Sequence, residues 1–164
     1  MKYIVHLFRI LVGGLFIFSG FVKAIDPLGT AYKMMEYFLE FGMGFMEPLS
    51  TTFSVFMIVF EIVLGVTLLL GYLPVLTTWS LLLMIIFFTF LTGYTSITGN
   101  VTDCGCFGDF LKLKPIESFT KDLILLAMSL ILFWKKEYIQ PILENKYNLV
   151  ITIFTTVGFL VFCF

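Results

Sequence analysis

The sequence predicts an all-helical integral membrane protein, with a four-helix transmembrane bundle, a fifth C-terminal span and a periplasmic amphipathic helix. Of the 164 residues, 60% are hydrophobic and only 13% are charged. The mean hydropathy of +1.05 lies outside the range of soluble domains. Apolar runs also recur at lengths close to the roughly 20 residues that a helix needs to cross a bilayer. The formal net charge of −1 gives no reason to expect a nucleic-acid partner.

Five apolar runs are expected to cross the membrane, at 3–22, 53–71, 75–97, 119–134 and 149–164. The first is too long for a signal peptide and lacks a small-residue cleavage site, so we expect an uncleaved span. The fourth is short, and Lys121 and Trp134 are expected to anchor it at the two interfaces. The fifth stops at Phe164 without a polar flank, which favours a continuation. We therefore expect a four-helix membrane domain over 1–134, then a cytoplasmic connector and fifth span over 135–164, leading to a further domain.

An amphipathic helix is predicted between the first two spans. Asp26 and Pro27 form an N-cap followed by proline at the first helical position. Apolar side chains then recur at helical spacing, with charged residues largely opposite them: Ala31, Met34, Met35, Phe38 and Phe41 against Lys33, Glu36 and Glu40. The pattern indicates a helix on the membrane surface, able to cover the loop that contains Cys104 and Cys106 as a lid. A connector that packs on the bundle explains it equally well.

Basic residues do not decide the orientation. With a cytoplasmic amino terminus, five lie on each side: Lys2, Arg9, Lys135, Lys136 and Lys146 inside, and Lys23, Lys33, Lys112, Lys114 and Lys121 outside. The loop between the third and fourth spans carries Cys104 and Cys106, and a dithiol that cycles belongs on the oxidising face of the membrane. We therefore expect the bacterial inner membrane, with this loop in the periplasm.

The segment 103–109, Asp-Cys-Gly-Cys-Phe-Gly-Asp, is the best candidate for chemistry. Alternate residues of an extended chain lie near the upper limit of the Cα separation that a disulfide tolerates, so Cys104 and Cys106 need a turn to pair. Gly105 permits one, because glycine adopts positive φ without steric cost. The resulting ring is expected to be strained and easily reduced. Cys104 and Cys106 are therefore the predicted catalytic pair.

Two other interpretations of this segment stay open. Cys104, Cys106, Asp103 and Asp109 could supply two sulfur and two oxygen ligands, but one C-x-C without a second Cys or His cluster is a poor zinc signature. The disulfide could also be a static staple of the loop. The remaining cysteine, Cys163, is expected to be a small buried hydrophobe. We predict no metal site.

Two ionisable residues lie inside predicted spans. Arg9 is about two turns into the first span and Glu61 is near the middle of the second, where an unpaired charge costs several kcal/mol. We expect both to face the bundle interior and to form an ion pair with each other. The functional alternative is that Glu61 relays protons or hydrogen-bonds a quinone carbonyl, which makes Glu61 and Arg9 candidate cofactor-binding residues. In the third span, a face of small and weakly polar residues is expected to contact another helix: Thr89, Thr92, Gly93 and Ser96.

These residues carry a resemblance to a known family. The first two predicted spans and the segment between them resemble the DoxX-like membrane proteins at Arg9, Gly13, Phe16, Ser19, Gly20, Lys23, 26–30, 36–38, Glu61, Gly65 and Gly71. The segment 104–108 is similar to the related methylamine-utilisation MauE branch. Together these motifs cover 1–134. The resemblance implies a four-helix membrane bundle, a general logic shared with vitamin K epoxide reductase and bacterial disulfide-forming membrane enzymes, and a periplasmic thioredoxin-like partner. Those enzymes use two cysteine pairs, whereas this chain has one C-x-C pair and Cys163.

The predicted function is membrane thiol-disulfide exchange, either as an oxidoreductase or as an electron conduit. Cys104 and Cys106 would exchange disulfides with a periplasmic thioredoxin-like or substrate protein, and electrons would pass to or from a membrane quinone. The alternative is a non-catalytic membrane subunit or assembly factor, in which the disulfide between Cys104 and Cys106 is structural.

Overall fold

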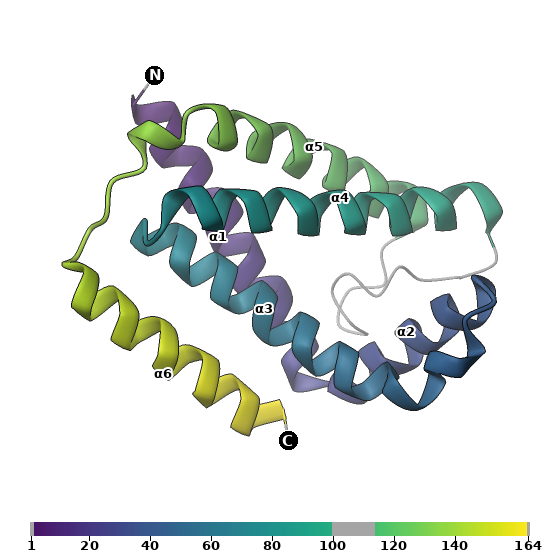
Figure 1. Cartoon of the computed structure of the whole chain (residues 1–164). Coiled ribbons are helices and arrows are strands. Elements are labelled where there is room, and N and C mark those ends of the chain that lie inside the picture. Colours follow the sequence, from purple (N-terminus) through teal and green to yellow (C-terminus); the bar gives the residue numbers. More distant parts are fainter. Residues whose placement is uncertain (1, 100–113, 164) are drawn as a thin grey trace.

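The computed structural model describes residues 2–99 and 114–163, and within those ranges every regular element is helical (Figure 1). The elements follow the chain as α1 (Lys2–Ile25), α2 (Pro27–Glu40), the 3₁₀ helix η1 (Gly44–Leu49), α3 (Ser50–Leu70), α4 (Pro74–Thr98), α5 (Pro115–Trp134), the 3₁₀ turn η2 (Lys136–Tyr138) and α6 (Asn145–Cys163). The all-helical prediction is confirmed for these residues.

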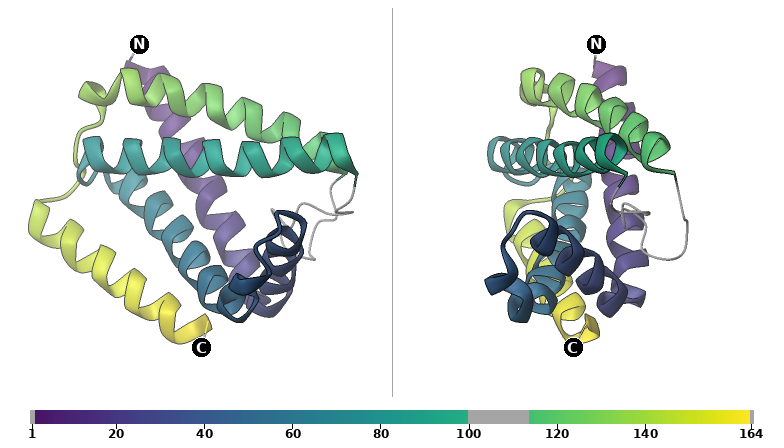
Figure 2. Two further views of the ribbon diagram at one scale, coloured as in Figure 1. Left: turned by 45° about the vertical axis from the view of Figure 1, so that its right-hand side comes forward. Right: turned by 90° about the vertical axis from the view of Figure 1, so that its right-hand side faces the viewer.

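Two helix pairs form the bundle. Helix α1 packs along α3, α4 packs along α5, and α1 also contacts α5. The two further views in Figure 2 keep α4 beside α5 and place α6 next to α3, on the side away from α5. The main apolar core gathers side chains from all four bundle helices, such as Val12 of α1, Leu68 of α3, Leu81 of α4 and Leu132 of α5. Helix α6 stays mostly exposed, as expected for a helix that faces lipid.

Helices α1 and α3 lie close together because glycines face each other across their interface. A Cβ atom on Gly65 would lie 2.8 Å from the carbonyl oxygen of Gly13, closer than real Cβ contacts allow. Small residues permit this approach of two backbones in a membrane bundle. The two helices are antiparallel, so this contact fixes their register. Arg9 lies beside the C-terminal end of α3, and Lys23 lies beside its middle.

Four segments are long and apolar enough to cross a membrane: Tyr3–Ile25, Gly44–Leu70, Pro74–Thr98 and Asn145–Cys163. They correspond to the first, second, third and fifth predicted spans. The predicted fourth span is also a helix, α5, but it is not among these four, and it contains Glu117, Lys121 and Asp122. A multi-pass membrane protein is therefore supported, whereas a total of five spans is not.

The predicted helix between the first two spans is α2. Its N-cap is as expected, since the Asp26 carboxylate accepts a hydrogen bond from the Gly29 amide at 2.9 Å. Ala31, Met34 and Phe38 are buried, and α2 packs against α3. The helix therefore packs on the bundle, as a connector would. Its position on the periplasmic side stays a prediction.

Candidate intramembrane ionic site

A buried ion pair joins α1 to α3. The Lys23 ammonium donates to the Glu61 carboxylate at 2.7 Å, and each side chain is only 5% exposed. The Lys23 ammonium also lies 4.6 Å from the ring centre of Phe88 on α4, a cation–π contact. An isolated charge at this depth would cost several kcal/mol, so each residue depends on the other for its compensation.

A second ion pair enters the same region from α5. The Lys121 ammonium lies 3.2 Å from one carboxylate oxygen of Asp122, and the hydroxyl of Thr92 on α4 donates to the other at 3.0 Å. The Asp122 side chain is 5% exposed and that of Lys121 is 24% exposed. A Cβ atom on Gly93 would lie 3.1 Å from the ring of Phe119 on α5. The predicted helix contact of the third span is confirmed at Thr92 and Gly93.

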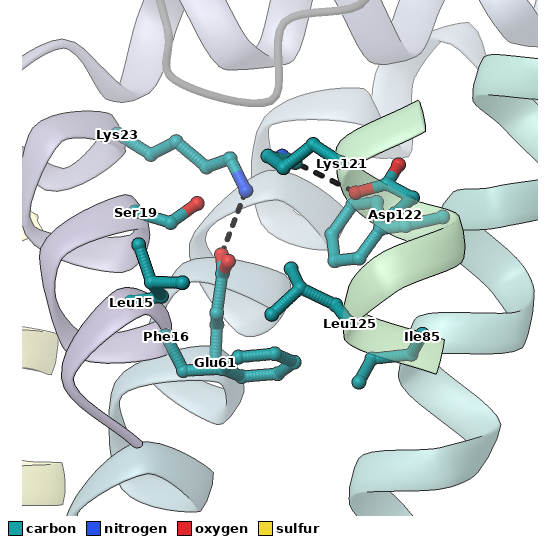
Figure 3. Close-up of a pocket in the computed structure, with 10 residues that line it drawn as sticks. Leu15, Phe16, Ser19, Lys23, Glu61, Ile85, Lys121, Asp122 and Leu125 are labelled. Carbon is teal, nitrogen blue, oxygen red and sulfur yellow. Dashed lines mark hydrogen bonds and ion pairs between the residues drawn. The ribbon is translucent and has the colours of Figure 1, made fainter. Parts of the chain in front are cut away.

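A cavity of about 30 Å³ lies between the two ion pairs. Figure 3 shows the Lys23 and Glu61 side chains pointing toward each other, with Lys121 and Asp122 approaching from α5. Phe16, Ile85 and Leu125 supply the apolar wall. A cavity of this volume, with charged groups in a largely apolar wall, has room for about one or two water molecules and is too small for an aromatic ligand. The four formal charges sum to zero, and a water between them could carry protons from one pair to the other.

The predicted ion pair between Arg9 and Glu61 is wrong. The Arg9 guanidinium instead donates to the carbonyl oxygens of Leu68 at 2.7 Å, of Gln140 at 3.1 Å, and of Leu69. The register of α1 against α3 explains the error, because Leu68 and Leu69 are roughly 11 Å along the helix from Glu61 at about 1.5 Å per residue. Arg9 thereby binds carbonyl groups at the C-terminal end of α3, where the Leu68 carbonyl also accepts from the Gly71 amide at 3.2 Å.

Arg9 and Glu61 therefore have different surroundings. Glu61 lines the ionic cavity and stays a candidate for proton transfer. Arg9 is absent from the lining and joins α1 to the end of α3 and to the segment that follows α5. Cofactor binding by Glu61 and Arg9 stays a prediction. The predicted catalytic pair, Cys104 and Cys106, lies outside the described residues. Cys163 is partly buried and packs against the cluster of Ala24, Ile58 and Ile62, close to expectation.

The sequence interpretation missed three members of this site. The charge pattern predicts that Lys23 and Lys121 flank the spans, but α1 continues to Ile25 and carries Lys23 into the interior. Asp122 lies inside the predicted fourth span, and an acidic residue in an apolar run was the available signal.

Among the described residues, no group of three or more His, Cys, Asp or Glu side chains could hold a metal ion.

Comparison with known proteins gives two findings. A family described as "Methylamine utilisation protein MauE" matches residues 1–135. The protein from Flavobacterium psychrophilum named "Protein TlpB" is 29% identical over 136 residues, which cover 81% of this chain. The chain spans 37% of the length of that relative. No solved structure matches. The resemblance to the MauE branch is thus confirmed, while that to the DoxX-like proteins stays a prediction.

Proposed function

The chain belongs to the family of methylamine utilisation protein MauE, and we propose that it performs thiol-disulfide exchange at the membrane through Cys104 and Cys106. The observation that carries the proposal is one buried and one partly buried ion pair, in a part of the bundle connected directly to the cysteine segment. Intramembrane ionisable residues commonly mark proton or ligand pathways. A dithiol reaction has to move protons as well as electrons.

The cysteine segment connects α4 to α5, two of the helices that contribute residues to the ionic site. Cys104 follows the end of α4 by six residues, and Cys106 precedes the start of α5 by nine. Lys121 and Asp122 lie in the second turn of α5, and Lys23 lies in the last turn of α1.

The end of α1 and the start of α5 lie on the same side of the bundle, because Lys23 and Lys121 line one cavity. Helix α4 ends on that side too, because Gly93 lies against Phe119 of α5 while Trp79 contacts Phe133. The cysteine segment is attached on that side.

The proposed reaction is a balanced exchange. A thiolate of the Cys104/Cys106 pair attacks the disulfide of the partner, and a mixed disulfide forms as one partner thiolate leaves. The second cysteine then attacks the mixed disulfide, which leaves this chain oxidised and the partner as a dithiol. Two electrons and two protons have moved to the partner, and the same steps run in reverse. Repeated turnover needs a second two-electron carrier, for which a lipid-soluble quinone is the proposed class.

The proposed location is the bacterial inner membrane, with the cysteine segment on the periplasmic face. Cytoplasmic thiols are kept reduced, so a pair that cycles is best placed on the oxidising side. The proposed partner is a periplasmic thioredoxin-like or substrate protein, since such proteins carry the accessible cysteine pair that the exchange requires.

The second candidate is a non-catalytic membrane subunit or assembly factor. The three-carbonyl contact of Arg9 favours it, because this contact and the ion pairs also serve to hold a rigid bundle in one arrangement. In that case the disulfide between Cys104 and Cys106 only holds its segment together.

The exchange is tested by trapping its intermediate. Cys104→Ser and Cys106→Ser each leave one thiol that can attack but cannot complete the exchange, so one of them should accumulate a mixed disulfide with the partner. Non-reducing electrophoresis of membranes from the native host should show this adduct, and a reductant should remove it. Cys163→Ser is the matched control, because it keeps both cysteines of the pair and should trap nothing. Absence of an adduct from both serine variants would favour the structural disulfide.

A further inference from the structure

We propose that a groove between α1 and α5 binds the ring of a lipid-soluble quinone, with a ring carbonyl at the ammonium of Lys121. The inference rests on the proposed exchange, which needs a membrane-soluble two-electron carrier. It adds the place where that carrier binds and the residues through which its protons travel.

The groove has the size and the polarity of a ligand site. Its volume is about 500 Å³, within the range of small-molecule pockets. Most of its wall is apolar and includes Leu11, Leu15 and Met128. The polar residues of the wall are Glu117, Thr120 and Lys121, at one end of the groove. The polar residues belong to the first two turns of α5, so this end lies on the side of the cysteine segment. A molecule with a polar ring and a hydrocarbon tail matches both parts.

The groove adjoins the ionic cavity. Leu15, Lys121 and Leu125 line both of them. The ring of a quinone does not fit the inner cavity of about 30 Å³, so it occupies the outer groove while water occupies the inner cavity. Lys121 thus separates a ring carbonyl on one side from Asp122 and the pair of Lys23 and Glu61 on the other.

This arrangement matches what quinone reduction requires. When the dithiol reduces the quinone, two S–H bonds break, one S–S bond forms, and two electrons pass to the ring. Two O–H bonds form on the two ring oxygens, and the two protons released by the thiols balance those taken up. A Lys121 ammonium hydrogen-bonded to the carbonyl stabilises the developing negative charge. The ionic cavity supplies the proton route, and quinol oxidation runs through the same groups in reverse.

A second groove provides the internal comparison. It lies between α3 and α4, has a volume of about 280 Å³, and is lined by residues such as Phe56, Phe60, Leu83 and Phe87. Ser80 is the one polar residue in its lining, and no charged residue contributes. A lipid chain can fill either groove. The charged end of the α1–α5 groove and its link to the buried ion pairs favour a quinone there.

The test uses the full chain in lipid nanodiscs and a photoreactive azido derivative of a prenylated quinone. Cross-linked peptides should map to α1 around Leu11 and Leu15 and to 116–128 of α5, and excess unmodified short-chain quinone should suppress the labelling. Leu15→Trp fills the proposed groove and should reduce the suppressible labelling by at least about tenfold, equivalent to a loss of about 1.4 kcal/mol in binding. Leu83→Trp fills the α3–α4 groove as the matched control and should leave the labelling unchanged.

Three results would overturn the proposal: labelling concentrated in the α3–α4 groove, labelling spread evenly over the lipid-facing helices, or labelling that excess lipid suppresses but excess quinone does not. The unaltered chain alone supplies this map, so the test does not depend on the folding of Leu15→Trp. The binding assay also needs no partner protein. If the quinone labels the α1–α5 groove but no mixed disulfide is trapped, the proposed thiol-disulfide exchange is contradicted. If a mixed disulfide is trapped but the quinone labels another part of the protein, the proposed quinone site is contradicted.

Discussion

Replacing Glu61 by glutamine should destabilise the protein by about 3–5 kcal/mol, the usual cost of removing one partner from a buried ion pair. The substitution leaves the Lys23 ammonium buried inside the bundle, with its cation–π contact to Phe88 as a weak substitute. Lys23→Met should have a similar effect, because it leaves the Glu61 carboxylate uncompensated. Thermal and denaturant unfolding in detergent would measure both.

The double variant tests whether Lys23 and Glu61 stabilise the protein as a pair or independently of each other. Lys23→Met combined with Glu61→Gln removes both charges, so its loss of stability should be smaller than the sum of the single losses by about 1–3 kcal/mol. The exposed pair of Lys33 and Glu36, with its nitrogen and oxygen 3.0 Å apart, is the matched control. Lys33→Met should cost no more than about 1 kcal/mol, as is typical of surface pairs. Additive losses at Lys23 and Glu61 would contradict the pairing.

Replacing Arg9 by alanine should be the other strongly destabilising change. Arg9 donates to the carbonyl oxygens of Leu68, Leu69 and Gln140, and among the described residues only that of Leu68 also accepts from a backbone amide, that of Gly71. An acceptor left without a donor in the interior costs about 1–3 kcal/mol. Gly71, which ends α3 with φ +70°, lies against the same guanidinium and against the carbonyl group of Gln140. Loss of Arg9 should therefore loosen the end of α3 together with the segment after α5, and we expect a marked fall in the unfolding temperature in detergent.

Arg9→Lys should recover only part of this stability, because a lysine ammonium cannot reproduce the planar arrangement of guanidinium donors. Lys146→Gln, at an exposed position near the start of α6, controls for the simple loss of a positive charge and should be nearly neutral. An Arg9→Ala variant as stable as Lys146→Gln would show that the three carbonyl contacts contribute little.

Most helix boundaries could be predicted from hydrophobicity and from the residues that end helices. The predicted spans 53–71 and 75–97 correspond to α3 (Ser50–Leu70) and α4 (Pro74–Thr98), because Gly71 and Pro74 interrupt the apolar pattern where one helix ends and the next begins. The apolar pattern predicts that the first span ends at 22, because Lys23 resembles a flanking charge. Helix α1 continues to Ile25 because Glu61 compensates that charge inside the bundle.

The site could be predicted only in part, because ion pairing depends on the register between helices. The sequence identifies Glu61 as a buried charge that needs a partner, but it points to Arg9, because Lys23 and Lys121 are expected outside the hydrocarbon layer. The close approach of Gly13 and Gly65 sets the register and places Lys23 at Glu61 and Arg9 at the end of α3. Hydropathy alone carries no information about this contact.

The most decisive measurement is a redox titration of Cys104 and Cys106 in the full chain in nanodiscs, with Cys163→Ser to leave a single pair. Thiol alkylation after equilibration in buffers of defined potential gives the fraction reduced. The proposed exchange predicts a midpoint potential above about −300 mV, the level below which structural disulfides typically lie. It also predicts complete reduction by a thioredoxin-like protein. A midpoint below that level, with resistance to such a protein, would contradict the exchange and identify the disulfide as a structural staple.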